Sequence, residues 1–284
     1  MEINSNPNSN SNFIAKYRSK IITAVIVLVI LALIFHHKKT PENLIKVGIT
    51  AGPMQQVMAV AKKEAIKRYG LDIEPVVFND YQTPNEALAS GDISANIFQT
   101  VAFLNDAMKQ QNYKFKTIAR TFIYPMGIFS KKIDNLTMLK QGAIVAIPND
   151  PSNEDRALRL LDRVGLIKLK TDFNGLASLQ EMTANPKELQ IKTLSAAQLP
   201  RVVPDVDIIV LNNDFVKDAG FKFNEALAHE DPEHAEPYIN VIVARADQAE
   251  NKKLKELVQV MRSQAVVKVN NNYFPGAIKA WKVD

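Results

Sequence analysis

The chain has 284 residues, of which 46% are hydrophobic and 23% are charged, and its formal net charge is +5 at pH 7. This composition is typical of a globular protein and excludes a largely disordered one. The chain contains no cysteine, which excludes disulfides, thiolate metal sites, cysteine nucleophiles and lipidation of a cysteine within it.

Most of the positive charge lies at the start of the chain. Residues 1–39 contain five basic residues and one acidic residue, a balance of 5 − 1 = +4, which leaves about 5 − 4 = +1 for the remainder. A nearly neutral main part has no basic surface of the kind that nucleic acid requires. We therefore expect no nucleic-acid partner.

The first segments predict a membrane attachment. Residues 1–20 begin with an Asn- and Ser-rich stretch without an apolar pattern, and we expect a disordered cytoplasmic tail there. Residues 21–35 then read IITAVIVLVILALIF, an uncharged run that is about 22 Å long as a helix. A cleaved signal peptide is the alternative, but two histidines and two lysines follow the run where a cleavage site needs small residues. We predict a retained, single-pass anchor over 21–37 in the cytoplasmic (inner) membrane, with the following residues outside it.

Beyond residue 44, strand and helix patterns alternate. The helix that starts near residue 53 carries apolar residues three and four positions apart, and Gly70 is expected to end it. Strands are predicted at 45–49, 71–78, 143–147, 207–211 and 238–244, and further helices at 84–90, 153–164 and 253–263. This alternation predicts an α/β fold of mainly parallel sheets with helices on both faces.

Polar or aromatic clusters follow several of these strands, at 51–53, 79–81, 149–151 and 212–213. In open α/β sheets, ligands bind beyond the carboxyl ends of the strands. Because the clusters come from distant parts of the chain, we expect them to form one cleft shared by two lobes.

Six segments, in this order, resemble the NlpA-type family of methionine-binding lipoproteins, the receptor subunits of methionine ABC importers. They are VVFNDYQTPNEALASGDISANIFQ (76–99), TFIYP (121–125), SKKI (130–133), IPNDPSNEDRALRLLDRVGLIKLK (147–170), AAQLPR (196–201) and PYINVIVAR (237–245). The resemblance runs from about residue 45 to 281. Members of the family usually end their signal in a lipidated cysteine, which this chain lacks.

The resemblance implies a two-lobed periplasmic-binding-protein (Venus-flytrap) fold that closes on an amino acid. Lobe 1 would comprise residues 42–127 and 237–284, and lobe 2 residues 128–236. The implied function is that of a monomeric, non-enzymatic receptor that captures methionine (L, D or both) or a related amino acid. It would need no cofactor, and its partners would be an ABC permease with its ATPase and the membrane that holds the N-terminal helix.

Arg156 is the candidate partner for the ligand carboxylate, because a guanidinium can grip a carboxylate with two hydrogen bonds. It lies in the first turn of the predicted helix, with Ser152 as the expected N-cap and Asp155 at the capping-box position. The alternative is a surface arginine that pairs with Glu154 or Asp155.

Three amides match positions that the family uses around the amino-acid backbone of its ligand: Asn149, Asn153 and Asn212. An amide suits a zwitterion because it both donates and accepts hydrogen bonds. Turn formation and helix capping are the alternative roles of these asparagines.

Tyr81, Phe98 and Tyr124 match the aromatic pocket of the family, where a thioether gains from contact with rings. Thr100 occupies a position at which the methionine binders typically carry a histidine. This difference predicts altered or relaxed specificity.

The acidic stretch from His229 to His234 is interpreted as a solvated loop rather than a metal site, because Pro232 would break a helix that aligned the two histidines. Two other classes of function remain open. An enzyme would need a base or nucleophile in the cleft, and a surface or adhesion protein would have lost amino-acid binding.

Overall fold

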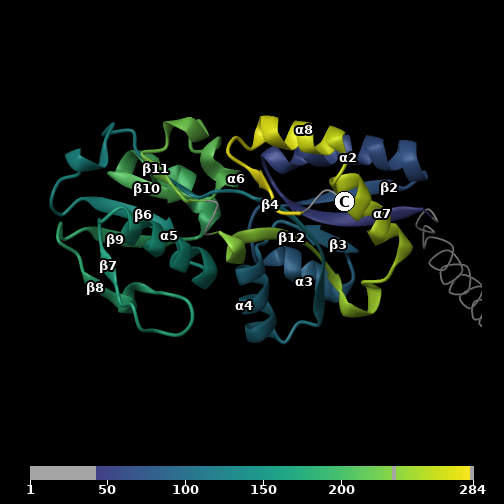
Figure 1. Cartoon of the computed structure of the whole chain (residues 1–284), viewed down its shortest axis with the longest axis horizontal. Coiled ribbons are helices and arrows are strands. Elements are labelled where there is room, and N and C mark those ends of the chain that lie inside the picture. The colour runs from purple at the N-terminus through teal and green to yellow at the C-terminus, as the bar shows by residue number, and fades with distance from the viewer. Residues whose placement is uncertain (1–42, 232–234, 282–284) are drawn as a thin grey trace, which may run out of the picture. The chain divides into compact units, whose positions relative to one another are not determined.

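Figure 1 shows the computed structural model, which describes residues 43–231 and 235–281. The predicted tail (1–20) and membrane anchor (21–37) lie outside these residues, so they stay predictions. Within the described ranges, no helix has both the length and the apolar character that crossing a membrane requires.

The first sheet has six strands and holds the beginning and the end of the described chain. Its order is β13 (Ile278–Lys279), β4 (Phe115–Ile123), β12 (Ile239–Arg245), β3 (Ala95–Ile97), β1 (Leu44–Thr50) and β2 (Asp72–Phe78). Helices cover both faces (Figure 1). On one face lie α2 (Pro53–Tyr69), α7 (Lys252–Met261) and α8 (Gln264–Tyr273), and on the other α3 (Thr83–Ser90) and α4 (Val101–Gln111). We call this part the first lobe.

The second sheet has five strands, in the order β11 (Ala228–His229), β5 (Gly127–Phe129), β10 (Ile208–Leu211), β6 (Ile144–Pro148) and β9 (Gln190–Leu194). Helix α5 (Pro151–Arg163) packs on one face, and η3 (Ala196–Asp205) and α6 (Asn213–Val216) pack on the other. The strand residues alternate between these two cores, as the period of two in a strand requires: Val145 and Ile147 face α5, whereas Ala146 faces η3. We call this part the second lobe.

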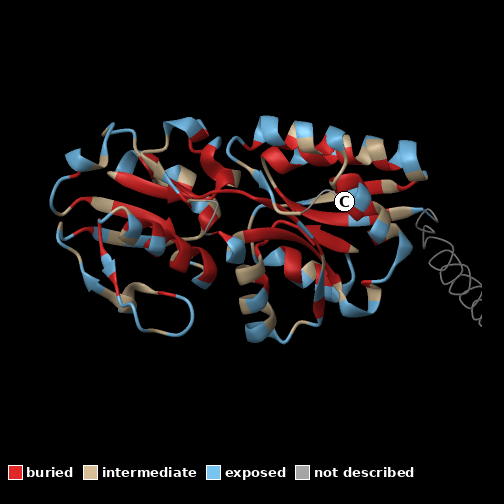
Figure 2. Ribbon diagram, in the orientation of Figure 1, coloured by how far each residue is buried: buried red, intermediate tan, exposed pale blue. Residues whose placement is uncertain are grey.

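The remaining elements are short. A two-stranded ribbon pairs β7 (Lys168–Leu169) with β8 (Met182–Ala184). Single turns of 3-10 helix lie at Leu136–Met138, Leu179–Glu181, Phe223–Glu225, Glu236–Tyr238 and Ala246–Gln248. Figure 2 shows that buried residues concentrate in the central strands and on the helix faces turned toward them.

Each strand and helix predicted from the sequence is present within a few residues of its expected ends, and α2 ends at Gly70 with a left-handed φ of 62°. The expectation of mainly parallel sheets is wrong, because both sheets are mixed. β1 pairs in parallel with β2 and β3, and β6 does so with β9 and β10, but β12 is antiparallel to β3 and β4, and β5 is antiparallel to β10 and β11.

The mixed pairing follows from how the chain connects the two sheets. It leaves the first sheet through β4 and enters the second through β5, with residues 124–126 between them. It returns from β11 to β12, which therefore runs opposite to β4 and pairs with it in an antiparallel ladder. The fold is the α/β, two-lobed architecture that the sequence predicts, while the predicted lobe limits at 127, 128, 236 and 237 stay a prediction.

Candidate functional site

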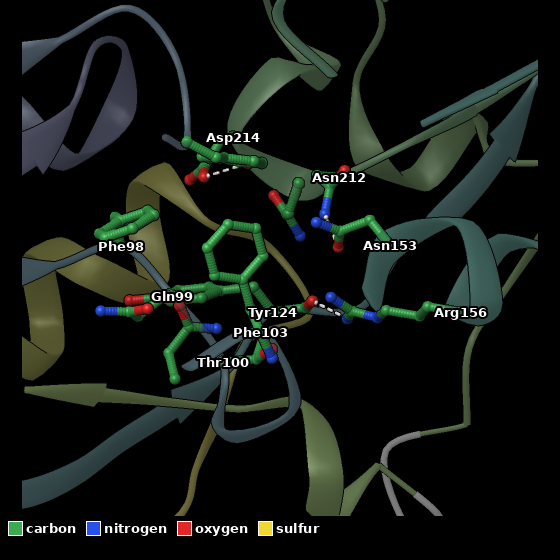
Figure 3. A pocket seen from close by; sticks show the side chains of 12 residues that line it. Phe98, Gln99, Thr100, Phe103, Tyr124, Asn153, Arg156, Asn212 and Asp214 are labelled. Atoms are coloured by element: carbon green, nitrogen blue, oxygen red, sulfur yellow. Dashed lines mark hydrogen bonds between the residues drawn. The ribbon is translucent and has the colours of Figure 1, made fainter. Parts of the chain in front are cut away.

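A narrow cavity lies between the two lobes and is lined by side chains of both. Figure 3 shows the side chains that line it. The first lobe and the link between lobes contribute Tyr81, Phe98, Gln99, Thr100, Phe103, Tyr124 and Asn240, and the second lobe contributes Asn153, Arg156, Asn212, Asn213 and Asp214. Seven of the eight predicted site residues line this one cavity, and Asn149 is the exception.

Asn149 is exposed and lies one residue before the N-cap of α5, outside the cavity lining. The N-cap itself is Asp150, whose Oδ1 accepts a hydrogen bond from the backbone N–H of Asn153 at 3.0 Å. The expectation that Ser152 caps the helix is therefore wrong. Pro151 fits the first helical position because its missing N–H would have no helical partner there, so the helix starts two residues earlier than Ser152 would allow.

Arg156 is buried, with only 3% of its side chain exposed, and its partner is Glu230 rather than Glu154 or Asp155. Its Nε donates to Glu230 Oε1 and its Nη2 to Glu230 Oε2, each at 2.6 Å. Nη2 also donates to the carbonyl oxygen of Tyr124 at 2.6 Å. Burial alone would lower the pKa of Arg156, but the Glu230 carboxylate outweighs it and the pKa is raised.

One amino group of Arg156 stays available to a ligand. No acceptor within the described ranges pairs with Nη1, and Arg156 lines the cavity. Figure 3 shows its guanidinium at the edge of the open space. The Glu230 pair holds the guanidinium plane in one orientation, so Nη1 presents its N–H groups as a fixed anion-binding group.

A chain of hydrogen bonds fixes the orientation of the two predicted amides. Asn153 Nδ2 donates to both carboxylate oxygens of Asp150, at 2.9 and 3.0 Å, so its Oδ1 must face the other way. That Oδ1 accepts from Asn212 Nδ2 at 2.8 Å. Asn212 Oδ1 is consequently left as a buried acceptor without a partner among the described residues, at the cavity wall. A ligand N–H would satisfy it.

The predicted aromatic residues divide into two groups. The Tyr81 and Phe98 rings lie 5.8 Å apart between centroids, and both pack against Phe103. Tyr124 differs: its ring packs against Phe274 at 4.4 Å, and its hydroxyl donates to Asn270 Oδ1 at 2.7 Å. Three rings therefore form an apolar wall, while Tyr124 mainly supplies the carbonyl that holds Arg156.

Thr100 has a structural role besides lining the cavity. It is the N-cap of α4, and its Oγ1 accepts from the backbone N–H of Phe103 at 3.2 Å. Threonine is among the preferred N-cap residues, and histidine is not. The residue that departs from the family pattern thus also stabilises the helix that carries Phe103.

We expect Thr100→His to bind methionine up to about tenfold more tightly, since an added ring beside a thioether contributes at most about 1.5 kcal/mol. The same change should lower the free energy of unfolding by about 1 kcal/mol through loss of the cap. Calorimetric titration and thermal unfolding measure the two effects separately. Thr100→Ser retains the cap and is the matched control. An unchanged affinity in Thr100→His would mean that residue 100 does not touch the ligand.

Sequence reasoning missed Gln99, Phe103, Asn213, Asp214 and Asn240 as lining residues. Gln99 follows Phe98 directly and is held by a buried amide network: its Nε2 donates to Asn85 Oδ1 and Asn96 Oδ1, at 2.8 and 2.9 Å. Asp214 could have been found from the sequence, because it belongs to the same polar run after β10 as Asn212. No comparable signal precedes Asn240, which lies within a buried strand.

Asp214 connects the lobes. Its Oδ2 accepts from the Tyr81 hydroxyl at 2.8 Å and from Thr50 Oγ1 at 3.5 Å, and both donors belong to the first lobe. Burial raises the pKa of Asp214 to about 6, although these hydrogen bonds and the charge of Arg156 oppose the rise.

The interpretation of the acidic stretch as a solvated loop is wrong for Glu230, which is 6% exposed and pairs with Arg156. His229 is exposed, and His234 lies outside the described residues. In the part of the chain that the structure describes, no group of three or more His, Asp or Glu side chains could hold a metal ion.

Comparison with known proteins identifies the family. A model of the NlpA lipoprotein family matches residues 45–281, which is nearly all of the described chain. The chain belongs to the NlpA lipoprotein family. The NlpA family consists of substrate-binding proteins and not of enzymes, in agreement with the expectation from the sequence.

Named relatives support this assignment. The D-methionine-binding lipoprotein MetQ of Escherichia coli K12 is 43% identical over 248 residues, which cover 86% of this chain and 90% of that protein. A solved structure of the methionine-binding protein MetQ is 43% identical, with a TM-score of 0.82. The match covers 85% of this chain and 99% of the MetQ chain. A nutrient-binding protein from Burkholderia cenocepacia, solved bound to methionine, is 41% identical with a TM-score of 0.80. The match covers 84% of this chain and 100% of the Burkholderia chain. This NlpA family chain is therefore a substrate-binding protein.

Proposed function

We propose that this protein is the receptor of an ABC importer and captures methionine, in the L or D form or both, outside the cytoplasmic membrane. It acts as a monomer, tethered by residues 21–37, and hands its ligand to a permease driven by a separate ATPase. The names of the relatives support methionine as the ligand. Retention by a membrane helix is proposed because the chain has no cysteine to lipidate.

The observation that carries the proposal is a pair of polar groups at the cavity for which the described part of the chain supplies no hydrogen-bond partner. Arg156 Nη1 offers donors to a carboxylate, and Asn212 Oδ1 offers an acceptor to an ammonium group. An α-amino acid carries these two groups on one carbon atom. The rings of Tyr81, Phe98 and Phe103 then suit a flexible thioether side chain.

The protein binds its ligand without changing any covalent bond of that ligand. Each polar group would contact the ligand backbone, and closure of the lobes would exclude water from the polar contacts and strengthen them. Asp150 and Glu230 would act indirectly, since they orient Asn212 (through Asn153) and Arg156.

Thermal unfolding with a panel of amino acids tests the proposal. The protein is first unfolded and refolded to remove any bound ligand. L- or D-methionine at 100 times its dissociation constant should add about 2.7 kcal/mol to the free energy of unfolding. This corresponds to a rise of roughly 5–11 °C in Tm for a domain of this size. A rise in Tm with a different amino acid would support the receptor function and identify that amino acid as the ligand. Absence of a shift with every amino acid would favour a surface or adhesion protein that has lost binding.

A further inference from the structure

Asp214 lines the cavity and connects the two lobes. It lies in α6 of the second lobe, and the two side chains that donate to its Oδ2 come from the first lobe: Tyr81 after β2 and Thr50 at the end of β1. The loop after β1 is also close, because a Cβ on Gly52 would lie 3.4 Å from the carbonyl oxygen of Asp214. The position of this carboxylate is therefore set by both lobes.

The charged and titratable groups around Asp214 leave it without a cationic partner. Arg156 of α5 lies on the same cavity, but its guanidinium is paired with Glu230. Asp218, on the turn after α6, adds negative charge, and the other titratable neighbours are the Tyr81 and Tyr124 hydroxyls. Within the described ranges no lysine, arginine or histidine forms an ion pair with Asp214.

Enclosing an ionised carboxylate without a counter-charge is unfavourable, and that cost is the reason for the raised pKa of Asp214. A cation that enters the cavity would remove the cost. The cavity already supplies a neutral acceptor at Asn212 Oδ1, so an ammonium group that reached this region would find two oxygen acceptors of different strength.

We propose that Asp214 is a specificity-determining residue: its carboxylate, oriented by Tyr81 and Thr50, is the counter-charge for the ammonium group of the bound α-amino acid. This inference rests on the proposed function. It restricts the ligand class to molecules with a free, charged amine and excludes hydroxy-acid analogues of the same shape. It also couples closure of the lobes to arrival of the ligand, since at neutral pH the empty closed cavity would enclose a negative charge that has hydrogen-bond donors but no cationic partner.

The test compares methionine with its 2-hydroxy analogue, 2-hydroxy-4-(methylthio)butanoate, in which a hydroxyl group replaces the ammonium group. Calorimetric titration at pH 7.5 gives both dissociation constants for the wild type and for Asp214→Asn. We expect the wild type to prefer methionine by at least 100-fold. Asp214→Asn should reduce that preference about 10- to 100-fold, because a hydrogen bond to a charged group contributes roughly 1.5–3 kcal/mol.

Asp218→Asn is the matched control, since it removes an exposed carboxylate from the same short segment and touches neither Tyr81 nor Thr50. Its preference for methionine should equal that of the wild type. If Asp214→Asn fails to fold or binds neither ligand, Tyr81→Phe replaces it: this change keeps the ring, removes the hydroxyl that orients the carboxylate, and should reduce the preference severalfold.

An unchanged preference for methionine over its 2-hydroxy analogue in Asp214→Asn would overturn the inference. Where Tyr81→Phe is used instead, an unchanged preference in that variant would do the same. Failure of the proposed function would be seen differently, because the wild type itself would then bind no methionine in the titration. The ratio of two affinities in one variant also separates specificity from general damage to the fold, which would weaken both ligands alike.

Discussion

Replacing Arg156 by lysine is expected to weaken methionine binding by at least 100-fold. The guanidinium reaches both oxygens of Glu230 and the carbonyl of Tyr124 and still has Nη1 left for a ligand carboxylate. A lysine ammonium is a single point on a flexible stem and cannot hold this fork geometry. Because the positive charge is kept, the loss would report geometry rather than charge, and disruption of a buried charged contact typically costs 2–5 kcal/mol.

Calorimetric titration measures the effect of Arg156→Lys, with Arg159→Lys as its control. Arg159 lies one turn further along α5, is 47% exposed and pairs with Asp155, so its replacement should leave the affinity unchanged within about threefold. A change of less than about threefold in Arg156→Lys would show that the ligand carboxylate binds elsewhere. The stronger change, Arg156→Ala, should weaken binding at least as much but would also leave Glu230 buried without a partner.

Local patterns in the sequence predicted the elements of this fold well, because periodicity and end signals act within one segment. The helix α2 illustrates this: its apolar spacing and Gly70 define the buried face and the end of the helix. The helix α5 shows the limit. Both Asp150 and Ser152 can cap a helix, and the choice between them depends on the side chain of Asn153, which binds Asp150 as well.

Pairings between distant segments could not be predicted from the sequence. Glu230 is 74 residues from Arg156, and nothing in its own neighbourhood distinguishes it from a solvated acid. The direction of β12 is a similar case, since its apolar pattern suits a parallel or an antiparallel neighbour equally well. The contact of Tyr81 with Asp214 spans 133 residues and forms only where the lobes meet.

The positions of the site residues came from the resemblance to a family and not from periodicity. Arg156 and Asn212 both line the cavity, although no local pattern in the sequence predicts that Arg156 is buried. Asn149 differs from them because it is exposed and precedes the N-cap of α5, whereas Asn153, inside the helix, lines the cavity and binds Asp150. An alignment of motifs places residues along the chain, whereas the orientation of each amide depends on the hydrogen bonds that surround it.

Glu230→Gln is expected to lower the free energy of unfolding by about 3–5 kcal/mol, because it leaves Arg156 buried without its counter-charge. Arg156 and Glu230 have side-chain exposures of 3% and 8%, so water cannot replace the lost carboxylate. The Tm should fall by roughly 6–20 °C in thermal unfolding. Glu236→Gln is the control, since that side chain is 76% exposed in its ion pair with Arg120 and should contribute less than about 1 kcal/mol.

A double variant separates the two roles of the Arg156–Glu230 pair. Arg156→Leu combined with Glu230→Leu removes both charges, and apolar replacement of a whole buried pair is often neutral or stabilising. We therefore expect thermal stability to return to within about 1 kcal/mol of the wild type while methionine binding stays abolished. If the double variant were as unstable as Glu230→Gln, the pair would be holding the link between the lobes through the Tyr124 carbonyl, to which Arg156 Nη2 also donates. Recovery of stability without recovery of binding would instead mean that the pair is retained for the ligand, because it fixes the guanidinium plane at the cavity.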